Sequence, residues 1–191
     1  MTTMEQKNII TIAGKPGSGK STASKAVSSQ LNFEHFSSGD FFRAVGKERG
    51  IDVFQANLVA EQEKDIDESV DQKLRDLGET NDNMVIDSRM AWHWMPYSFK
   101  VYLNLDLSTA AERIFKTLEA ERMEVEDIPD TPEQYAERLQ KRLDSETKRY
   151  MNLYQANPYD VSNYDLVVNT ADHTPEEVQE IIVSGFKNWL K

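Results

Sequence analysis

Residues 14–21 read GKPGSGKS, the most informative segment of the sequence. It satisfies the pattern G-x-x-x-x-G-K-[S/T], in which glycines let the backbone turn its N–H groups inward around a phosphate. A run of β-branched residues, Asn8–Ala13 (NIITIA), precedes it, and Ser21–Leu31 carries the apolar spacing of a helix. The sequence around the motif therefore predicts a strand, a phosphate-binding loop (P-loop) and a helix, in that order.

The loop predicts a binding site for the phosphates of ATP. Lys20 supplies a mobile cation for the β- and γ-phosphates, and the Ser21 hydroxyl is a candidate ligand of Mg²⁺. The start of the helix adds its positive dipole end, and Thr22 is expected to contact the α-phosphate. The predicted ATP-binding residues of this segment are Gly14, Lys15, Pro16, Gly17, Ser18, Gly19, Lys20, Ser21 and Thr22.

The rest of the chain alternates short apolar runs with helix-forming segments. Strands that alternate with helices indicate an α/β fold with a parallel sheet covered on both faces. Ligands of such sheets bind at the carboxyl ends of the strands, where the P-loop lies. Further strands are expected at 33–36, 84–88, 99–105 and 165–170, and further helices at 39–49, within 52–82, from 108 to about 122, at 131–154 and after 174.

Three helix starts carry recognisable signals. Ser108 is the expected N-cap of the helix that follows the fourth strand. Thr131 stands before a proline, which indicates the start of the long charged helix. Residues 174–177 (TPEE) read as a capping box with proline at the first helical position.

The composition restricts the possible classes of function. The 191-residue chain has a formal net charge of −11, from 22 Lys+Arg and 33 Asp+Glu, which disfavours a general attraction to nucleic acid or anionic lipid. It has no cysteine, which excludes disulfides and thiolate chemistry. Residues 1–7 do not show the long apolar stretch of a signal peptide, and no apolar run reaches the roughly 18 residues that span a bilayer. We expect one cytoplasmic domain, a monomer, whose partners are small molecules.

The segment after the second expected strand predicts the acceptor side of the site. It reads SSGDFFR at 37–43. Gly39 and the start of the helix offer backbone N–H donors. Arg43 lies one turn into the helix, where its guanidinium could bind a monophosphate through two hydrogen bonds. The predicted acceptor-binding residues of this segment are Ser38, Gly39, Asp40 and Arg43.

The third expected strand ends in IDSR at 86–89. A carboxylate at this position lies beside the P-loop, so Asp87 is a candidate, with Ser21, for holding Mg²⁺ and its waters. Arg89, two residues further on, would reach the phosphate of the acceptor. The structural alternative is that this aspartate and arginine only pair with each other at the start of a loop.

Arginines recur along one face of the helix expected at 131–154. Enzymes catalyse phosphoryl transfer chiefly by positioning and by neutralising charge on the moving group. Arginines delivered by a closing lid would do both and would exclude water. We therefore predict that Arg142 and Arg149 are catalytic, together with Lys20 and Asp87, whereas other arginines of this helix only pair with glutamates on a solvated face.

Other classes of P-loop protein fit this sequence less well. A switch GTPase should carry a guanine-reading N-K-x-D segment after a later strand, and the chain has none. Motor ATPases and transporters need a far longer sequence. The acceptor segment and the arginines instead favour a small-molecule kinase.

The chain resembles the nucleoside monophosphate kinases, and most closely the archaeal-type cytidylate kinases, over nearly its whole length. The P-loop is common to many families, whereas the acceptor segment and the last two segments are more specific together. The resemblance rests on GKPGSGKST (14–22), SSGDFFRAVGKERG (37–50), DIDESVDQKLRDLGE (65–79), IDSRMAWHWM (86–95), AERI (111–114), SETKRY (145–150) and YDVSNYDLVVNT (159–170).

The resemblance implies a P-loop NTPase core with parallel strands in the order 2-3-1-4-5. It further implies an NMP-binding lobe at approximately 39–82 and a lid at approximately 119–131. The implied reaction transfers the γ-phosphate of ATP to CMP or dCMP, with Mg²⁺.

By position, the resemblance also assigns roles to site residues in four groups. It implies that the acceptor phosphate is held by Arg43 and Arg89, the transferring phosphate by Lys20, Arg142 and Arg149, the cytosine amino group or ribose by Asp67 and Asp71, and the adenine by Asn169 and Thr170.

Two other functions stay open at this point. Ser88 stands where the family usually has glycine, and a side chain there would change the acceptor pocket, so AMP, UMP, shikimate or a nucleoside is an alternative acceptor. Thr117 stands where family members often carry an arginine, which leaves room for a nucleotide-binding regulator without turnover.

Overall fold

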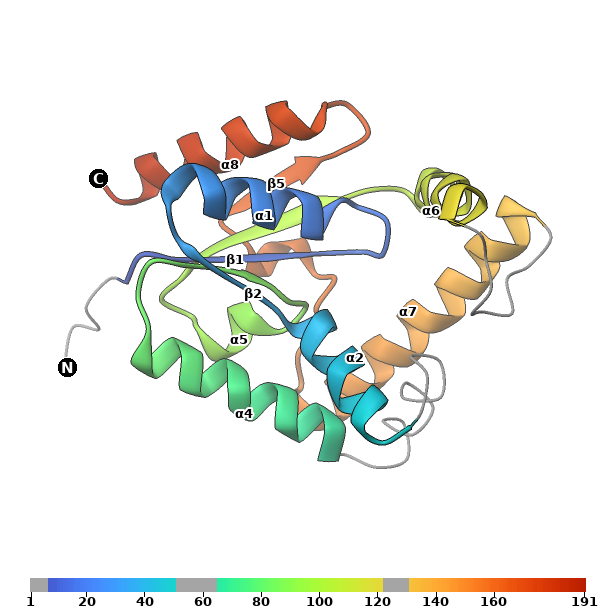
Figure 1. Cartoon of the computed structure of the whole chain (residues 1–191), viewed down its shortest axis with the longest axis horizontal. Helices are drawn as coiled ribbons and strands as arrows, with labels where there is room; N and C mark the ends of the chain where they lie inside the picture. Colours follow the sequence, from blue (N-terminus) through green and yellow to red (C-terminus); the bar gives the residue numbers. More distant parts are fainter. Residues whose placement is uncertain (1–6, 51–64, 122–130) are drawn as a thin grey trace.

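A computed structural model of the protein describes residues 7–50, 65–121 and 131–191, without the side chains of 65–67 and 117–121. At its centre, five strands form a parallel sheet in the order β2-β3-β1-β4-β5 (Figure 1), which confirms the expected α/β class and strand order. The order switches at β1, so its carboxyl end marks the place where ligands bind in such sheets. The strands are β1 (Ile9–Gly14), β2 (Glu34–Ser37), β3 (Met84–Asp87), β4 (Phe99–Asn104) and β5 (Leu166–Asn169).

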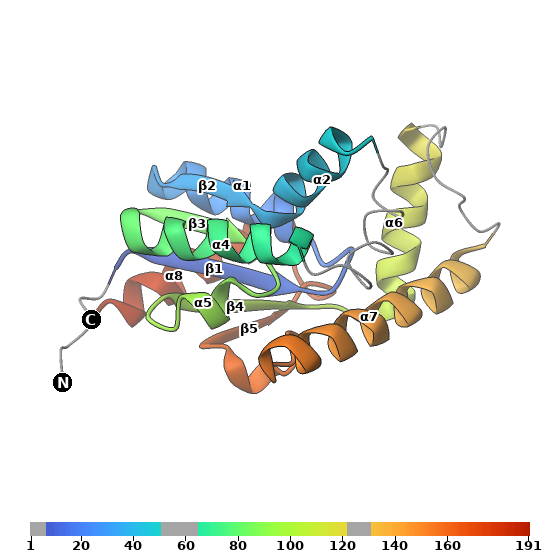
Figure 2. The same ribbon diagram turned by 90° about the horizontal axis from the view of Figure 1, so that it is seen from below.

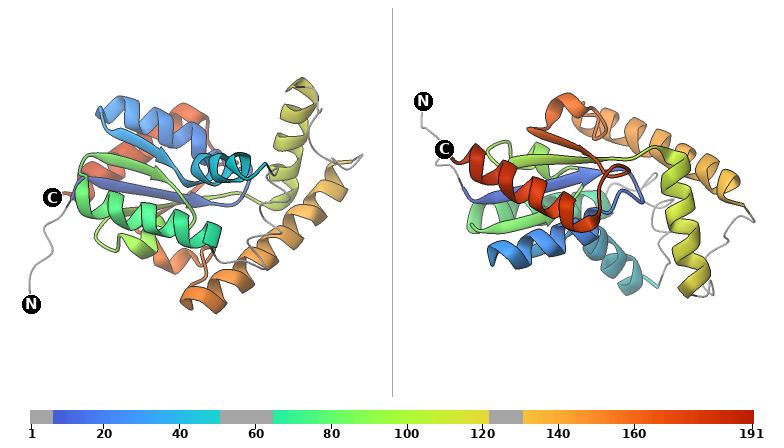
Figure 3. Two further views of the ribbon diagram at one scale, coloured as in Figure 1. Left: turned by 60° about the horizontal axis from the view of Figure 1, so that its bottom comes forward. Right: turned by 90° about the horizontal axis from the view of Figure 1, so that it is seen from above.

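Helices cover both faces of the sheet. Figures 1 and 3 show α1 and α8 on one face, and Figure 2 shows α4 and α5 on the other. Helices α2, α6 and α7 extend beyond the carboxyl ends of the strands. The helices are α1 (Lys20–Leu31), α2 (Ser38–Glu48), α4 (Asp65–Thr80), α5 (Ala91–Trp94), α6 (Leu107–Glu121), α7 (Pro132–Tyr154) and α8 (Pro175–Trp189), with a 3₁₀ turn η1 (Val161–Asn163).

The central strand β1 is buried at all six residues, as its apolar sequence predicts. Because successive side chains of a strand point to opposite faces, β1 contributes to two cores. Ile10 and Ile12 pack with Phe186 in the core under α1 and α8. Ile9 packs with Leu74 in the core under α4 and α5. Both faces of β1 are thus fixed, which holds the loop that follows it.

Helices α6 and α7 share a smaller core at the edge of the sheet. Leu105, Ala110 and Leu139 are buried there. The two helices diverge from this contact, as Figure 3 shows, and α7 then passes the carboxyl ends of the strands. This packing places the middle of α7 opposite the P-loop. Among the described helices, none is both long enough and apolar enough to cross a membrane.

The capping signals of α7 and α8 are confirmed. Thr131 accepts a hydrogen bond from the backbone of Gln134 at 3.3 Å. Thr174 and Glu177 form the reciprocal capping box, with distances of 2.8 Å and 3.2 Å. These caps satisfy backbone N–H groups that a helix start leaves without partners.

The expected N-cap of α6 is wrong by two residues. The helix begins at Leu107, and the carboxylate of Asp106 accepts the backbone N–H of Thr109 at 2.8 Å. Ser108 itself donates its hydroxyl to Asp106 at 2.6 Å. A carboxylate at the first position accepts both donors, so it caps the helix in place of the serine.

Candidate active site

The P-loop joins the carboxyl end of β1 to the start of α1. At Gly14, φ is 149° and a Cβ would lie 2.3 Å from the carbonyl oxygen of Leu103 on the neighbouring strand, so only glycine fits. At Gly19, the residue before α1, φ is 82°, which is in the left-handed region that glycine adopts without strain. Within the loop, the Ser18 hydroxyl donates to the carbonyl oxygen of Lys15 at 2.9 Å. These features hold the loop in a tight turn.

Lys20 and Ser21 project from the first turn of α1. The Lys20 ammonium donates to the carbonyl oxygen of Lys15 at 2.8 Å, so it folds back over the loop. Its burial and the nearby positive charge of Arg89 lower the pKa of Lys20 to about 8. The Ser21 hydroxyl donates to Oδ2 of Asp87 at 2.7 Å. This contact joins the P-loop to the end of β3, as the predicted Mg²⁺ site requires.

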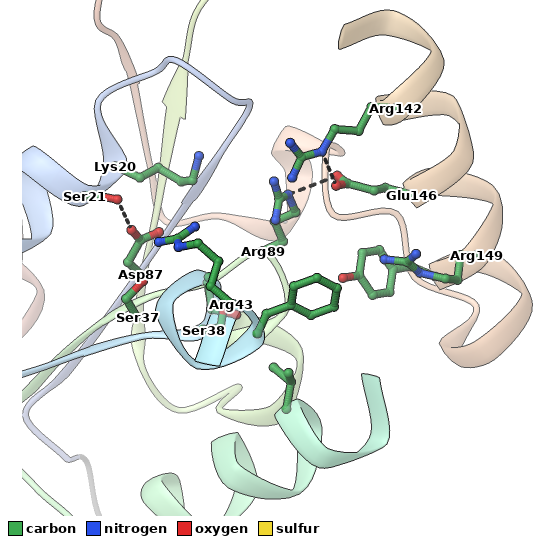
Figure 4. A pocket seen from close by; sticks show the side chains of 15 residues that line it. Lys20, Ser21, Ser37, Ser38, Arg43, Asp87, Arg89, Arg142, Glu146 and Arg149 are labelled. Carbon is green, nitrogen blue, oxygen red and sulfur yellow. Dashed lines mark hydrogen bonds and ion pairs between the residues drawn. The ribbon is translucent and has the colours of Figure 1, made fainter. Parts of the chain in front are cut away.

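A pocket opens where β1, β2 and β3 end, and α7 closes its far side (Figure 4). Five of the lining residues are basic and two are acidic. In a chain whose net charge is −11, this is a local concentration of positive charge suited to phosphate groups. The lining residues are Lys20, Ser21, Ser37, Ser38, Gly39, Phe42, Arg43, Val70, Asp87, Ser88, Arg89, Arg142, Glu146, Arg149 and Tyr150.

The acceptor segment forms one wall of this pocket through the start of α2. The Ser37 hydroxyl accepts the backbone N–H of Asp40 at 3.2 Å and so caps the helix. Arg43, one turn into α2, forms an ion pair with Asp40, and the hydrogen bond from Arg43 lowers the pKa of Asp40. About half of the Arg43 side chain, 52%, is exposed, so its guanidinium is accessible from the pocket.

Glu146, which the sequence analysis did not single out, lies at the centre of the opposite wall. Its Oε1 accepts a hydrogen bond from Nε of Arg142 at 2.9 Å, and its Oε2 lies 3.0 Å from Nε of Arg89. The Tyr159 hydroxyl also donates to Oε2. Burial alone would raise the pKa of Glu146, but the two guanidinium groups outweigh it and hold that pKa at about 2. The carboxylate is therefore ionised and fully engaged.

Arg89 and Arg149 complete the basic lining. Burial alone would lower the pKa of Arg89, but the Glu146 carboxylate outweighs this effect and raises it. The Arg149 guanidinium lies 5.3 Å from the ring centroid of Tyr150, within the range of a cation–π contact. Arg149 lies further along α7 than Arg142, as Figure 4 shows.

Nine of the residues predicted as catalytic, metal-binding or acceptor-binding meet in this one pocket. They come from the P-loop, the start of α2, the end of β3 and the middle of α7, so the fold brings together what the sequence keeps apart. They are Lys20, Ser21, Ser38, Gly39, Arg43, Asp87, Arg89, Arg142 and Arg149.

Asp71 does not line the pocket. Its side chain is buried in α4, where Oδ1 accepts from Nε1 of Trp94 at 3.0 Å and Oδ2 accepts from the Tyr154 hydroxyl. Burial raises the pKa of Asp71, although these two hydrogen bonds act in the opposite direction. Both oxygens therefore serve the junction of α4, α5 and α7. The side chain of Asp67, the other candidate for reading the cytosine or ribose, lies outside the described residues.

The segment predicted to bind adenine lies at the end of β5. The Asn169 side chain donates to Asp172 at 2.7 Å. Thr170 is buried, and its carbonyl oxygen accepts from a terminal nitrogen of Arg113 at 2.9 Å. Arg113, in the AERI segment of α6, thus joins α6 to the segment that follows β5. Thr22 is exposed on α1.

Sequence reasoning missed several lining residues besides Glu146. Phe42, Val70 and Tyr150 supply the apolar part of the lining. Each of the three is a direct sequence neighbour of a residue that was predicted to belong to the site. Their position in the sequence could therefore have indicated that they line the pocket. For Glu146 the signal was its position four residues after Arg142 on a helix, the spacing of an ion pair.

The pocket suits a Mg²⁺ ion that is shared with substrate phosphates. Magnesium prefers oxygen ligands and usually binds through one or two carboxylates, waters and phosphates. Ser21 and Asp87 offer a hydroxyl and a carboxylate in contact with each other. In the described part of the chain, no cluster of three or more acidic or histidine side chains forms a site of its own.

Comparisons with known proteins agree on the family and the fold. Residues 10–129 match a protein family described as "AAA domain". The chain is 36% identical to a cytidylate kinase of Haloarcula marismortui over 95% of this chain and 90% of that protein. It is 37% identical to a cytidylate kinase of Thermoplasma volcanium, over 92% and 89%. A crystal structure of shikimate kinase from Aquifex aeolicus shares the fold, with a TM-score of 0.55, 20% identity and coverage of 94% and 96%.

Proposed function

Because the chain belongs to the cytidylate kinase family, we propose that it is an ATP-dependent phosphotransferase that passes the γ-phosphate of ATP to CMP or dCMP. One observation supports this function above the others. The P-loop with Lys20 and an arginine-bearing wall line a single pocket, so a donor and an acceptor phosphate can meet there. The positive lining stands out against the acidic composition of the whole chain.

The donor side binds the triphosphate of ATP. Backbone N–H groups of the P-loop surround the phosphates, and the Lys20 ammonium exchanges the Lys15 carbonyl for β- and γ-phosphate oxygens. Asn169 and Thr170 lie at the end of β5, where they would contact the adenine. Ser21 and Asp87 would hold Mg²⁺, which neutralises phosphate charge when it is bound.

The acceptor side binds the monophosphate. Arg43 from α2 and Arg89 from the end of β3 are placed to hold its oxygens through charge-assisted hydrogen bonds. Phe42, Val70 and Tyr150 supply the apolar surface that a base requires. We assign the NMP-binding lobe to approximately 39–82, of which residues 51–64 lie outside the described part.

Transfer takes place between the two phosphates. An oxygen of the acceptor phosphate attacks the γ-phosphorus in line, its new P–O bond forms as the bond to the β–γ bridging oxygen breaks, and ADP leaves. A phosphate monoester is largely a dianion at neutral pH, so the attacking oxygen needs no general base. Arg142 and Arg149 from α7 neutralise the charge on the moving group.

The lid expected at approximately 119–131 falls largely on residues 122–130, which lie outside the described part of the chain. The side chain of Thr117, where the family often has an arginine, is also outside it. Ser88 does line the pocket, but its hydroxyl accepts the backbone N–H of Met90 at 3.3 Å. The Ser88 hydroxyl therefore stabilises the turn that precedes α5.

A panel of acceptors tests the proposed function. Release of ADP is followed in a coupled assay with CMP, dCMP, UMP, AMP and shikimate at a fixed ATP concentration. We expect kcat/KM for CMP or dCMP to exceed that for the other acceptors by at least tenfold. Activity on CMP no greater than on the rest would reassign the acceptor, and ATP binding without turnover on any acceptor would favour a regulator.

A further inference from the structure

One buried carboxylate holds two arginines that come from opposite sides of the pocket. Glu146 on α7 contacts Arg142, one turn earlier on the same helix, through Oε1 at 2.9 Å. It contacts Arg89, at the end of β3, through Oε2 at 3.0 Å. The third contact comes from the Tyr159 hydroxyl, which belongs to the segment between α7 and η1. Three segments of the chain therefore converge on this one side chain.

Both oxygens of the Glu146 carboxylate are engaged by protein side chains. Its side chain is only 4% exposed, and both carboxylate oxygens already have partners. A charge this deeply buried is stable only when it is paired and hydrogen-bonded. Glu146 therefore acts through the two arginines that it contacts.

Among the described residues, both arginines contact Glu146 through Nε, which leaves their terminal nitrogens available. Arg89 and Arg142 each face the carboxylate with Nε, the nitrogen nearest the chain. In Figure 4 the guanidinium ends of both lie between Glu146 and Lys20. An arginine held in this way keeps its terminal amino groups for phosphate oxygens. The carboxylate also offsets the repulsion between two cations held close together.

We propose that Glu146 is a positioning residue that links the acceptor-phosphate arginine Arg89 to the transferring-phosphate arginine Arg142 and fixes both for in-line transfer. This inference rests on the proposed function, in which the two arginines bind different phosphates. Tyr159 supports the arrangement by fixing Oε2. The link also joins the core of the sheet to α7, so the two phosphate sites keep their spacing.

Charge-neutral and shortened variants of Glu146 test the proposal. Glu146→Gln keeps the shape but removes the charge, and Glu146→Asp keeps the charge but shortens the reach. The matched control is Asp144→Asn, which removes one charge from an exposed position on the same helix. Turnover of CMP is measured for all of them, at a temperature where circular dichroism shows each to be folded.

A second readout follows the arginines directly. Proton–nitrogen NMR of ligand-free protein records the Nε–H groups of Arg89 and Arg142, assigned with Arg→Lys variants. The Nε of Arg142 donates a hydrogen bond to the carboxylate, and the buried Nε of Arg89 lies in an ion pair with it, so both protons should exchange slowly with water. This measurement needs no acceptor, so it judges the inference even if the wild type proves inactive toward CMP, a result that would refute the proposed function alone.

We expect Glu146→Gln to lower kcat about a hundredfold, the usual cost of misplaced catalytic groups, and to lose both slow Nε–H signals. Glu146→Asp should fall between this variant and the wild type, and Asp144→Asn should stay within about twofold of the wild type. Wild-type kcat in Glu146→Gln, or a loss of kcat with both signals unchanged, would overturn the proposal. If Glu146→Gln does not fold, Tyr159→Phe decides by the same two readouts, since it removes only one hydroxyl.

Discussion

Arg43 shows how a single exposed side chain can serve the reaction without supporting the fold. It lines the pocket from α2 and forms an ion pair with the neighbouring Asp40 on the same helix. Surface pairs of this kind contribute about 0–1 kcal/mol to stability. A charge-assisted hydrogen bond to a bound phosphate is stronger than that, because the site excludes much of the solvent. Loss of Arg43 should therefore affect substrate binding far more than stability.

Arg43→Ala should raise KM for CMP by roughly tenfold to a hundredfold, the equivalent of one lost charge-assisted hydrogen bond. The free energy of unfolding should change by less than about 1 kcal/mol. Steady-state kinetics and urea titration measure the two effects. Lys47→Ala, which removes a charge from an exposed position in the last turn of α2, is the control and should leave KM unchanged. An unchanged KM in Arg43→Ala would remove this residue from the acceptor site.

At this scale the sequence predicted the charged groups that stand at fixed places in the motifs. Lys20, Asp87 and Arg89 lie at or just after the ends of strands, so their positions at one edge of the sheet follow from the parallel topology. The partner of Arg89 could not be predicted in the same way. Glu146 is 57 residues away in the sequence, and the contact exists only because α7 packs across the ends of the strands. The partners of Asp71 could not be predicted for the same reason, because Trp94 and Tyr154 lie on other helices.

The turn from β1 to α1 is the element on which the site depends. Three glycines of this turn have positive φ, and two of them, Gly14 and Gly19, allow a matched comparison. At Gly14 a side chain would collide with the backbone of β4, whereas at Gly19 a Cβ would meet no atom within 4 Å. Strain at positive φ acts at both positions, and the collision acts only at the first.

Gly14→Ala should therefore lower the free energy of unfolding by about 3 kcal/mol, the sum of backbone strain and overpacking. Gly19→Ala should lower it by only about 1 kcal/mol. Urea unfolding followed by circular dichroism measures both values. Equal losses in the two variants would show that the contact with Leu103 is not what restricts Gly14.

The sequence predicted the long elements better than the short ones. Strands and helices with clear apolar periodicity were located within a few residues, and the caps at Thr131 and Thr174 marked their starts. Helix α5 (Ala91–Trp94) was not predicted, because four residues carry no helical period. The cap of α6 was assigned to Ser108 although Asp106 performs it, since both residue types favour that position.

For the whole molecule, the strand order was predicted through the resemblance to a family and not from periodicity. Alternating strands and helices restrict the class of fold but leave the order of the strands open. The order matters here because it places β2 and β3 beside β1, so that three strand ends converge on one pocket. The gathering of basic side chains in one pocket is likewise a property of the folded chain.

The buried charge at Glu146 also links the stability of the whole molecule to pH. Its pKa is lowered from 4.5 to about 2 in the folded protein. A group with a lowered folded pKa stabilises the protein above its unfolded value and loses that effect as pH falls toward the folded value. The contribution should therefore be complete above about pH 4.5 and disappear near pH 2.

Glu146→Gln should be less stable than the wild type by about 3 kcal/mol at pH 6, the usual cost of breaking a buried ion pair. The difference should narrow as the pH falls from 4.5 toward 2, since the wild-type carboxylate is then protonated as well. Urea unfolding of both proteins across this range gives the result. A difference that stays constant with pH would mean that the charge of Glu146 does not stabilise the fold.

In the proposed function, the P-loop and the arginine-bearing wall bring two phosphates together for direct transfer. The most direct test is to mix the protein with ATP labelled at the γ-phosphate and with CMP, and to locate the label in the products. Direct transfer predicts that the label appears in the β-phosphate of CDP in an amount equal to the ADP formed. Label released as inorganic phosphate, or retained in ATP while CMP is bound, would contradict it.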